Sequence, residues 1–396
     1  MRAQMHAHKC MHPCVRTRMG TCTHSRMHAL VQPDANGALA PVPGYLTEQI
    51  HHVLRHHQDD PIPSVEVIEY AELIDSCDMG PLQWRQVAQD IHKHYEAFDG
   101  FVVIMGTDTL AYTASALSFM FENLGKTVII TGSQVPIARI NSDARRNLLF
   151  AFALACTLDI PEVCVVFDQV LLRGVRSRKE DSGNFAAFSS PFMPPLATLG
   201  LSVQVNTSLL LPQPKGPFRL QADMDTKVIV LKILPAFDTV ALHRLATLGA
   251  PEARAVVLEL AVLDQVQLFD AHFASALDKL RHKDFLVVIT SPNPAVPSGP
   301  TPSKSSSRST PFPSSATMPS DPTPYHRAAA PAPTSQLGAL DSVAQKQDEP
   351  HQGAGFDRQG GCRWDMQRLG GLGVVSACDL TTEACCAKIG ELERAI

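Results

Sequence analysis

Apolar residues between positions 65 and 167 fall into two alternating patterns. In four segments, each five or six residues long, apolar side chains are continuous or occupy every second position. Both patterns are typical of β-strands, and the continuous one indicates strands that are buried on both faces. The four segments are 65–70, 101–105, 127–131 and 163–167.

Between these segments, apolar residues recur every three or four positions, which predicts amphipathic helices. One expected helix covers 81–98 and begins with a proline, a residue favoured in the first helical turn. A second covers 110–124 and is followed by Gly125, a residue that commonly ends helices. A third follows Ser142 and Asp143, which are both able to cap its first turn. This alternation predicts βαβ units and therefore a doubly wound parallel sheet.

The strand pattern returns in the C-terminal half. Three further segments, 226–234, 255–260 and 285–290, are separated by residues with a helical pattern. We expect them to form a second, smaller α/β domain. The expected organisation is a leader at 1–30, an N-terminal domain at 31–208, a linker at 209–226 and a C-terminal domain at 227–396.

Composition limits the possible classes of function. The chain has 396 residues, of which 45% are apolar and 18% are charged, enough for the cores of two or three domains. A net charge of −5 provides no global basic field for nucleic acid or acidic membranes. No stretch approaches the ~18 apolar residues of a membrane-spanning helix. The ten cysteines have no repeated spacing and, without a secretory signal, predict reduced thiols in an intracellular protein.

Two segments differ in composition from the rest of the chain. Residues 1–30 contain no acidic residue and are rich in Met, His, Cys and Arg. This composition fits an organellar transit peptide, or an unstructured or wrongly assembled N-terminus. Residues 291–336 hold 12 of the 30 prolines, among many Ser, Thr and Ala. Such a tract buries too little apolar surface to offset its ordering entropy, so we expect a disordered insertion at about 291–355.

Polar residues follow three of the N-terminal strands, in the loops 74–79, 106–109 and 132–134. Ligands of open α/β sheets bind outside the carboxyl ends of the strands, so these loops are candidates for a site. Thr107 and Asp108 also lie where a helix begins, with free backbone N–H groups. The same residue types serve as ordinary helix caps and turn residues, so both interpretations stay open at this point.

Other chemistries have less support in the sequence. Cys10, His12 and Cys14 match no strong zinc-binding spacing. Cys385 and Cys386 are adjacent on an expected helix, where neighbouring side chains point in different directions, so we expect them to pack rather than to form a redox pair. No glycine motif for a dinucleotide or a nucleoside triphosphate follows a strand.

Longer motifs at the same places resemble a known family. Segment 106–137 (GTDTLAYTASALSFMFENLGKTVIITGSQVPI) is similar to the second signature of the bacterial-type L-asparaginase family, in its cytosolic type I branch. Segment 74–79 (IDSCDM) resembles the family's Asp-Ser-Ser-Asp-Met loop, and 171–197 resembles the segment with its active-site lysine. Segment 371–389 is similar to its C-terminal helix.

The resemblance implies a fold, a reaction and an assembly. The expected fold is a larger N-terminal doubly wound parallel-sheet domain plus a smaller C-terminal α/β domain. The expected reaction is hydrolysis of the side-chain amide of L-asparagine to L-aspartate and ammonia, through a threonine nucleophile and with no metal or organic cofactor. A cytoplasmic homodimer or homotetramer is implied, with no nucleic-acid or membrane partner.

The resemblance also assigns roles to residues. Thr107 and Asp108 match the family's second threonine and its aspartate, Lys179 matches the active-site lysine, and Thr21 is the counterpart of the nucleophilic threonine. A threonine hydroxyl is a poor nucleophile at neutral pH and needs a neighbouring base, while an adjacent aspartate can hold and tune a lysine. The residues expected to bind the substrate are Asp75, Ser76, Cys77, Asp78 and Ser133.

The chain departs from the family pattern in several places. No apolar strand precedes Thr21, and Met19 replaces a glycine of the family's Thr-Gly-Gly-Thr-Ile-Gly motif. Met105 replaces a histidine, and 261–265 lacks the Gly-Ser-Gly-Asn loop that reaches a neighbouring subunit. Loss of the first strand would leave the centre of a parallel sheet unpaired. Two alternatives follow: a catalytically impaired protein that keeps an amino-acid-binding or regulatory pocket, or an N-terminal sequence that replaces the true first exon.

Overall fold

In the computed structural model, the chain is described at residues 18–23, 31–33, 39–41, 44–55, 64–70, 75–224, 227–234, 239–248, 253, 255–260, 271–283, 285–291, 375–377 and 380–392. The expected insertion after Ser291 lies outside these residues, as do most of the expected leader and the candidate zinc ligands Cys10, His12 and Cys14.

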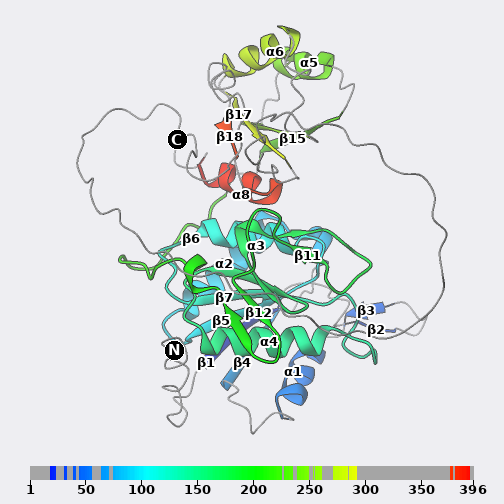
Figure 1. Ribbon diagram of the computed structural model, residues 1–396, viewed down its shortest axis with the longest axis vertical. Coiled ribbons are helices and arrows are strands. Elements are labelled where there is room, and N and C mark those ends of the chain that lie inside the picture. The colour runs from blue at the N-terminus through cyan, green and yellow to red at the C-terminus, as the bar shows by residue number, and fades with distance from the viewer. Residues whose placement is uncertain are drawn as a thin grey trace, which may run out of the picture. The chain divides into compact units, whose positions relative to one another are not determined.

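The N-terminal half of the chain forms a sheet of eight strands (Figure 1). They are β1 (Arg18–Thr23), β4 (Ser64–Glu69), β5 (Gly100–Ile104), β7 (Thr127–Thr131), β8 (Val163–Phe167), β9 (Val170–Arg173), β12 (Ala197–Leu199) and β13 (Val203–Val205). Their order is β13-β12-β9-β8-β7-β5-β1-β4.

The sheet is parallel from β4 to β8 and antiparallel beyond it. The prediction of a wholly parallel sheet is therefore wrong at one edge. Only Asp168 and Gln169 separate β8 from β9, and Asp168 has a positive φ of 52°. Two residues can join antiparallel strands only, because a parallel connection needs a crossover of about a dozen residues or more.

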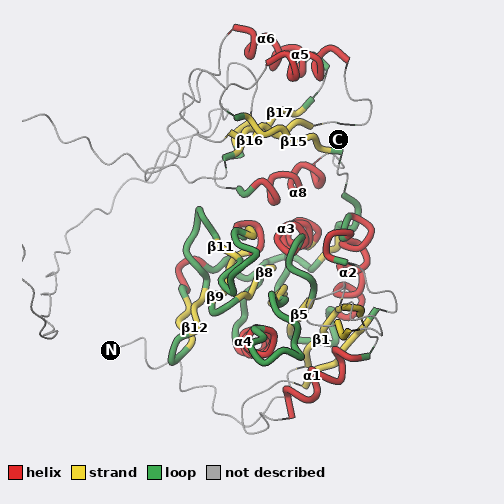
Figure 2. The backbone as a smooth tube through the Cα atoms, turned by 90° about the vertical axis from the view of Figure 1, so that its right-hand side faces the viewer, coloured by secondary structure: helices red, strands yellow, loops and turns green. Residues whose placement is uncertain are grey.

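Helices cover both faces of this sheet, as predicted (Figure 2). On one face lie α1 (Tyr45–Arg55) and α4 (Ala144–Thr157), and on the other lie α2 (Pro81–His94) and α3 (Leu110–Met120). Every residue of β5, β7 and β8 is buried, which explains their continuous apolar sequences. Along β5, Val102 and Ile104 join the core with α4, whereas Val103 joins the core with α2 and α3.

The sequence predicted no strand at β1, which lies next to the edge strand β4 and not at the centre of the sheet. β1 pairs in parallel with β4 on one side and with β5 on the other. Its residues are not an apolar run, but two β-strands flank this position and their ladder groups need partners. Tertiary context of this kind often overrides the weak local preference of a segment for the strand conformation. The expected loss of the first strand is therefore wrong for the backbone.

The C-terminal half forms a second sheet of four parallel strands. They are β15 (Val228–Ile233), β16 (Ala255–Leu260), β17 (Leu286–Thr290) and β18 (Val375–Ser376). One core contains α5 (Thr239–Leu248) and α6 (Ala271–Arg281), and another contains α8 (Thr382–Leu392). Both sheets belong to one compact unit of the chain, and the predicted domain boundaries stay a prediction.

Shorter elements complete the described part of the chain. Three small antiparallel pairs are β2 (Val31–Pro33) with β3 (Leu39–Pro41), β6 (Phe121–Glu122) with β14 (Arg219–Leu220), and β10 (Arg178–Lys179) with β11 (Phe188–Ser189). The 3₁₀ turns are η2 (Ser76–Asp78), η3 (Gly174–Arg176) and η4 (Thr207–Leu209). Among the described residues, no helix has the length and apolar character needed to cross a membrane.

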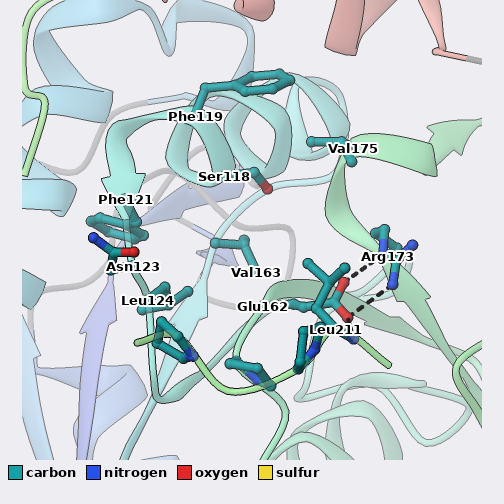
Figure 3. A pocket seen from close by; sticks show the side chains of 13 residues that line it. Ser118, Phe119, Phe121, Asn123, Leu124, Glu162, Val163, Arg173, Val175 and Leu211 are labelled. Carbon is teal, nitrogen blue, oxygen red and sulfur yellow. Dashed lines mark hydrogen bonds and ion pairs between the residues drawn. The ribbon is translucent and has the colours of Figure 1, made fainter. Parts of the chain in front are cut away.

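A largely buried ion pair ties residues 209–211 to the large sheet. Arg173, at the end of β9, forms a two-pronged contact with Glu162, just before β8, and the second prong is 2.9 Å long. Arg173 also donates to the Leu209 carbonyl at 2.6 Å, and Glu162 accepts from the Leu211 N–H at 2.9 Å. The pair lines a pocket of about 320 Å³ near the end of α3 (Figure 3). It therefore fixes residues 209–211 at the amino end of β8.

Removing the carboxylate of this pair is expected to destabilise the protein strongly. In Glu162→Ala, the largely buried side chain of Arg173 loses its counter-charge, a change that for a buried pair typically costs about 3–5 kcal/mol. Urea unfolding followed by fluorescence measures the loss. The control is Arg281→Ala, which removes a pair between two half-exposed side chains, Arg281 and Asp278, for which about 0–1 kcal/mol is expected. Equal losses in the two variants would contradict this account.

Candidate active site

The side chain of Lys179 connects its own segment, β10, to the residues between β5 and α3, at the carboxyl end of β5. Its ammonium nitrogen lies 2.8 Å from Thr107 Oγ1 and 2.8 Å from Asp108 Oδ1. The lysine side chain is only 16% exposed, although it stands in a run of basic residues that would ordinarily lie in solvent. A hydroxyl, a carboxylate and an amine thus meet where α3 begins.

Local packing delivers Lys179 to this place. β10 pairs with β11, which fixes the backbone around the lysine. Just before it, η3 packs against α3 at Gly174. A Cβ on Gly174 would lie 2.8 Å from the Val163 carbonyl oxygen and 3.0 Å from Ser118 Oγ. Only glycine allows this approach, so Gly174 determines how closely the lysine segment follows α3.

The loop after β4 approaches Asp108 from the other side. Ser76 Oγ donates to Asp108 Oδ2 at 3.1 Å, and Cys77 Sγ lies 3.4 Å from the same oxygen. Thr109 Oγ1 donates to the Ser76 carbonyl at 2.5 Å, which ties this loop to the start of α3. The carboxylate of Asp75 accepts from the Cys77 N–H at 3.1 Å and caps η2. Asp108 therefore receives hydrogen bonds from both the lysine segment and the β4 loop.

These contacts shift two pKa values in opposite directions. The hydrogen bond from Lys179 is the largest influence on Asp108 and holds the pKa of its carboxyl group below the usual value, against the effect of partial burial. The pKa of the Cys77 thiol is raised, chiefly because the thiol donates to Asp108 and lies beside its negative charge. The carboxylate is thus ionised, whereas the thiol keeps its proton at neutral pH.

The remaining expected site residues have different positions. Ser133 is buried, and its hydroxyl oxygen has no hydrogen-bond partner among the described residues. Asp78 is exposed in η2. Thr21 lies inside β1, with Val102 of β5 as its neighbour, whereas Thr23 stands opposite Ile104 at the carboxyl end. The structure describes the backbone of Thr21 but not its side chain.

Gln134 belongs to the candidate loop 132–134, but the sequence assigned it no role of its own. Its Oε1 accepts a hydrogen bond from Thr107 Oγ1 at 3.2 Å. Its backbone N–H donates to both oxygens of Asp143, at 3.1 and 3.0 Å, and Asp143 is buried. A polar residue just after a strand looks like any turn residue in the sequence, so no local signal distinguished it.

A metal ion has one possible place among the described residues. Ligand atoms of Asp75, Cys77 and Asp108 lie within 4.8 Å of one another. Two of the three residues are exposed, and exposed acidic groups are common without a metal. Separately, a cavity of about 370 Å³ borders Lys179, and Tyr112, Arg178 and Glu259 also line it. Its volume is within the range of small-molecule sites.

Known proteins resemble this chain in sequence and in fold. A family model described as "Asparaginase, N-terminal" matches residues 23–211. The L-asparaginase 1 of Escherichia coli K12 is 39% identical over 233 residues, which cover 56% of this chain and 69% of that protein. The chain belongs to the asparaginase family.

Further relatives and solved structures extend the comparison. The mouse 60 kDa lysophospholipase is 44% identical over 194 residues, which cover 49% of this chain and 34% of that protein. The crystal structure of L-asparaginase I from Vibrio cholerae superposes with a TM-score of 0.71 at 26% identity, covering 96% of this chain and 93% of that one. A thermostable L-asparaginase from Thermococcus kodakarensis gives a TM-score of 0.61 at 25% identity, covering 70% and 80%. The asparaginase fold is therefore present.

Replacing Lys179 should release Asp108 from its low pKa. In Lys179→Met, the principal donor is lost, so the pKa of Asp108 should rise towards the usual value of an aspartate. Because the folded pKa is depressed, ionised Asp108 stabilises the protein above about pH 4, and this stabilisation disappears as pH falls through the folded pKa. Carboxyl ¹³C shifts of Asp108 between pH 2 and 6 measure the change.

Arg178→Met provides the matched control. This neighbouring cation pairs with Glu180 at 3.2 Å, so its loss should leave the Asp108 titration close to that of the wild type. If both variants shift the titration equally, the general loss of positive charge, rather than the Lys179 contact, is responsible.

Proposed function

We propose that the protein hydrolyses the side-chain amide of L-asparagine to L-aspartate and ammonia. One observation carries the proposal: Lys179 lies 2.8 Å from both Thr107 Oγ1 and Asp108 Oδ1 in a member of the asparaginase family. A hydroxyl beside an amine that an aspartate orients is the arrangement needed to move protons during amide cleavage. We assign substrate binding to the loop of Asp75, Ser76, Cys77 and Asp78 and to Ser133.

The proposed reaction has two steps. A threonine hydroxyl of the N-terminal segment, assigned to Thr21, attacks the amide carbon. The C–N bond breaks, the proton of the attacking hydroxyl passes to the leaving nitrogen, and ammonia departs. Water then cleaves the acyl ester, which releases L-aspartate and restores the hydroxyl. Thr107, Lys179 and Asp108 relay the protons in both steps, and no metal or organic cofactor is required.

One observation favours the alternative of an impaired enzyme that binds amino acids. The register of β1 puts Thr21 opposite Val102, two positions before the strand end at Thr23. A nucleophile has to reach the substrate at the carboxyl end of the sheet, and a residue inside a strand is poorly placed for this. The protein would then keep a pocket without efficient turnover.

Assembly as a homodimer or homotetramer and a cytoplasmic location are further parts of the proposal, by likeness to the family.

Loss of the central groups should abolish most ammonia release. Thr107→Ala and Lys179→Met each remove a proton-transfer group, so kcat for L-asparagine should fall by about 10²–10⁴-fold. A coupled ammonia assay with purified protein measures the rates. Arg281→Met, at a half-exposed position on α6, should keep near-wild-type activity. Equal activity of the wild type and Thr107→Ala would refute the proposed hydrolysis.

A thermal-shift titration separates the enzyme from the binding module. If the pocket binds an amino acid without turnover, L-aspartate at 100 times its Kd should stabilise the protein by about 2.7 kcal/mol and raise Tm, while ammonia release stays undetectable. Asp75→Ala should weaken this stabilisation. A flat titration together with absent turnover would exclude both candidate functions.

A further inference from the structure

The side-chain amide of Gln134 contacts both segments that form the Lys179 site. Its Oε1 accepts from Thr107 Oγ1 at 3.2 Å. Its Nε2 donates to the carbonyl oxygens of Asp181 and Asn184, at 3.4 and 3.2 Å. These two carbonyls belong to the turn between β10 and β11, which follows Lys179 directly. One side chain therefore links the start of α3 to the lysine hairpin.

The partners of Gln134 fix the orientation of its amide. Backbone carbonyl oxygens only accept hydrogen bonds, so the amide nitrogen has to face Asp181 and Asn184. The amide oxygen is then left facing Thr107, and it can only accept. The single proton of the Thr107 hydroxyl consequently points to Gln134, and its oxygen lone pairs remain for the ammonium of Lys179.

A buried network holds Gln134 in place. Asp143 accepts from the backbone N–H of Gln134 at 3.0 Å and from that of Val135 at 3.0 Å. Asn147 donates to Asp143 at 3.1 Å and to the Gly132 carbonyl at 2.9 Å. Both Asp143 and Asn147 are buried, with relative exposures of 3% and 0%. The loop after β7 is thus anchored independently of the groups that its glutamine contacts.

We propose that Gln134 is a positioning residue for the asparaginase reaction. It directs the Thr107 hydroxyl so that its lone pairs meet Lys179, and it binds the turn at 181–184 to the loop after β7. The first part of this role rests on the proposed function. The second part is a structural contact that exists whether or not the protein turns over asparagine.

Two substitutions separate the two parts of the role. Gln134→Glu keeps an acceptor for Thr107 but replaces the amide donor, so both carbonyl contacts are lost. Gln134→Leu removes the acceptor and the donor together at similar size. Gln86→Glu and Gln86→Leu, at an exposed position on α2, are the matched controls for the same chemical changes. Circular dichroism and Tm establish that each variant is folded.

Steady-state kinetics test the direction of the hydroxyl. We expect kcat for L-asparagine to fall about tenfold in Gln134→Leu, the effect of losing one orienting hydrogen bond, with KM changed less than about twofold. In Gln134→Glu, kcat should fall by a smaller factor, because the new carboxylate still accepts a hydrogen bond from Thr107. If Gln134 had only a structural role, both substitutions would lower kcat equally. Equal kcat values in the two variants would therefore overturn the proposed orientation of the Thr107 hydroxyl.

Limited proteolysis tests the contact with the hairpin and needs no activity. Trypsin cleaves after Arg178 and Lys179, next to the turn that Gln134 binds, so both Gln134 variants should be cut there several-fold faster than the wild type and the Gln86 variants. Unchanged cleavage in both Gln134 variants would overturn the proposal, even for a wild type that hydrolyses asparagine. Faster cleavage in a protein without turnover would support the hairpin contact while refuting the proposed function.

Discussion

The arrangement of this site depends on the contact of the Lys179 ammonium with two oxygens, Thr107 Oγ1 and Asp108 Oδ1. Lys179 lies 71 residues beyond Asp108 in the sequence, and its nearly buried charge needs a carboxylate within hydrogen-bond distance. Asp108 meets that need and itself receives hydrogen bonds from Ser76 and Cys77. The end of β5, the loop after β4 and the hairpin of β10 and β11 are therefore held together by the neutralisation of a single charge.

Much of the fold was predictable because strands buried on both faces have continuous apolar sequences. The expected segments at 127–131, 163–167 and 255–260 match β7, β8 and β16 residue for residue. The expected helix at 110–124 ends earlier, since Phe121 and Glu122 pair with β14 almost a hundred residues later. Partners so distant leave no local pattern. The same reason hid β1, which is a strand because β4 and β5 flank it.

The site was predictable in its residue types and less so in its connections. Polar loops at the carboxyl ends of strands pointed to Thr107 and Asp108 without any resemblance. Lys179 could be selected from its basic neighbours only by likeness to the family, because burial is a property of the folded chain. Gln134 lay in a candidate loop but received no role, since its side chain contacts two segments that are distant in the sequence, the start of α3 and the turn after Lys179. Sequence patterns reflect the neighbours of a residue along the chain, whereas this glutamine contacts residues that are distant in the sequence.

The close approach at Gly174 has a consequence for how the family can vary. β9 runs back from the turn at Asp168, and η3 then meets α3 before the chain reaches Lys179. The position of Lys179 is thus set by the packing of η3 against α3, and not by the number of residues between β8 and the lysine. Insertions or deletions at the tip of the β8–β9 hairpin would be absorbed before that contact. A hairpin tip of different length would leave Lys179 in place, provided that the glycine remains.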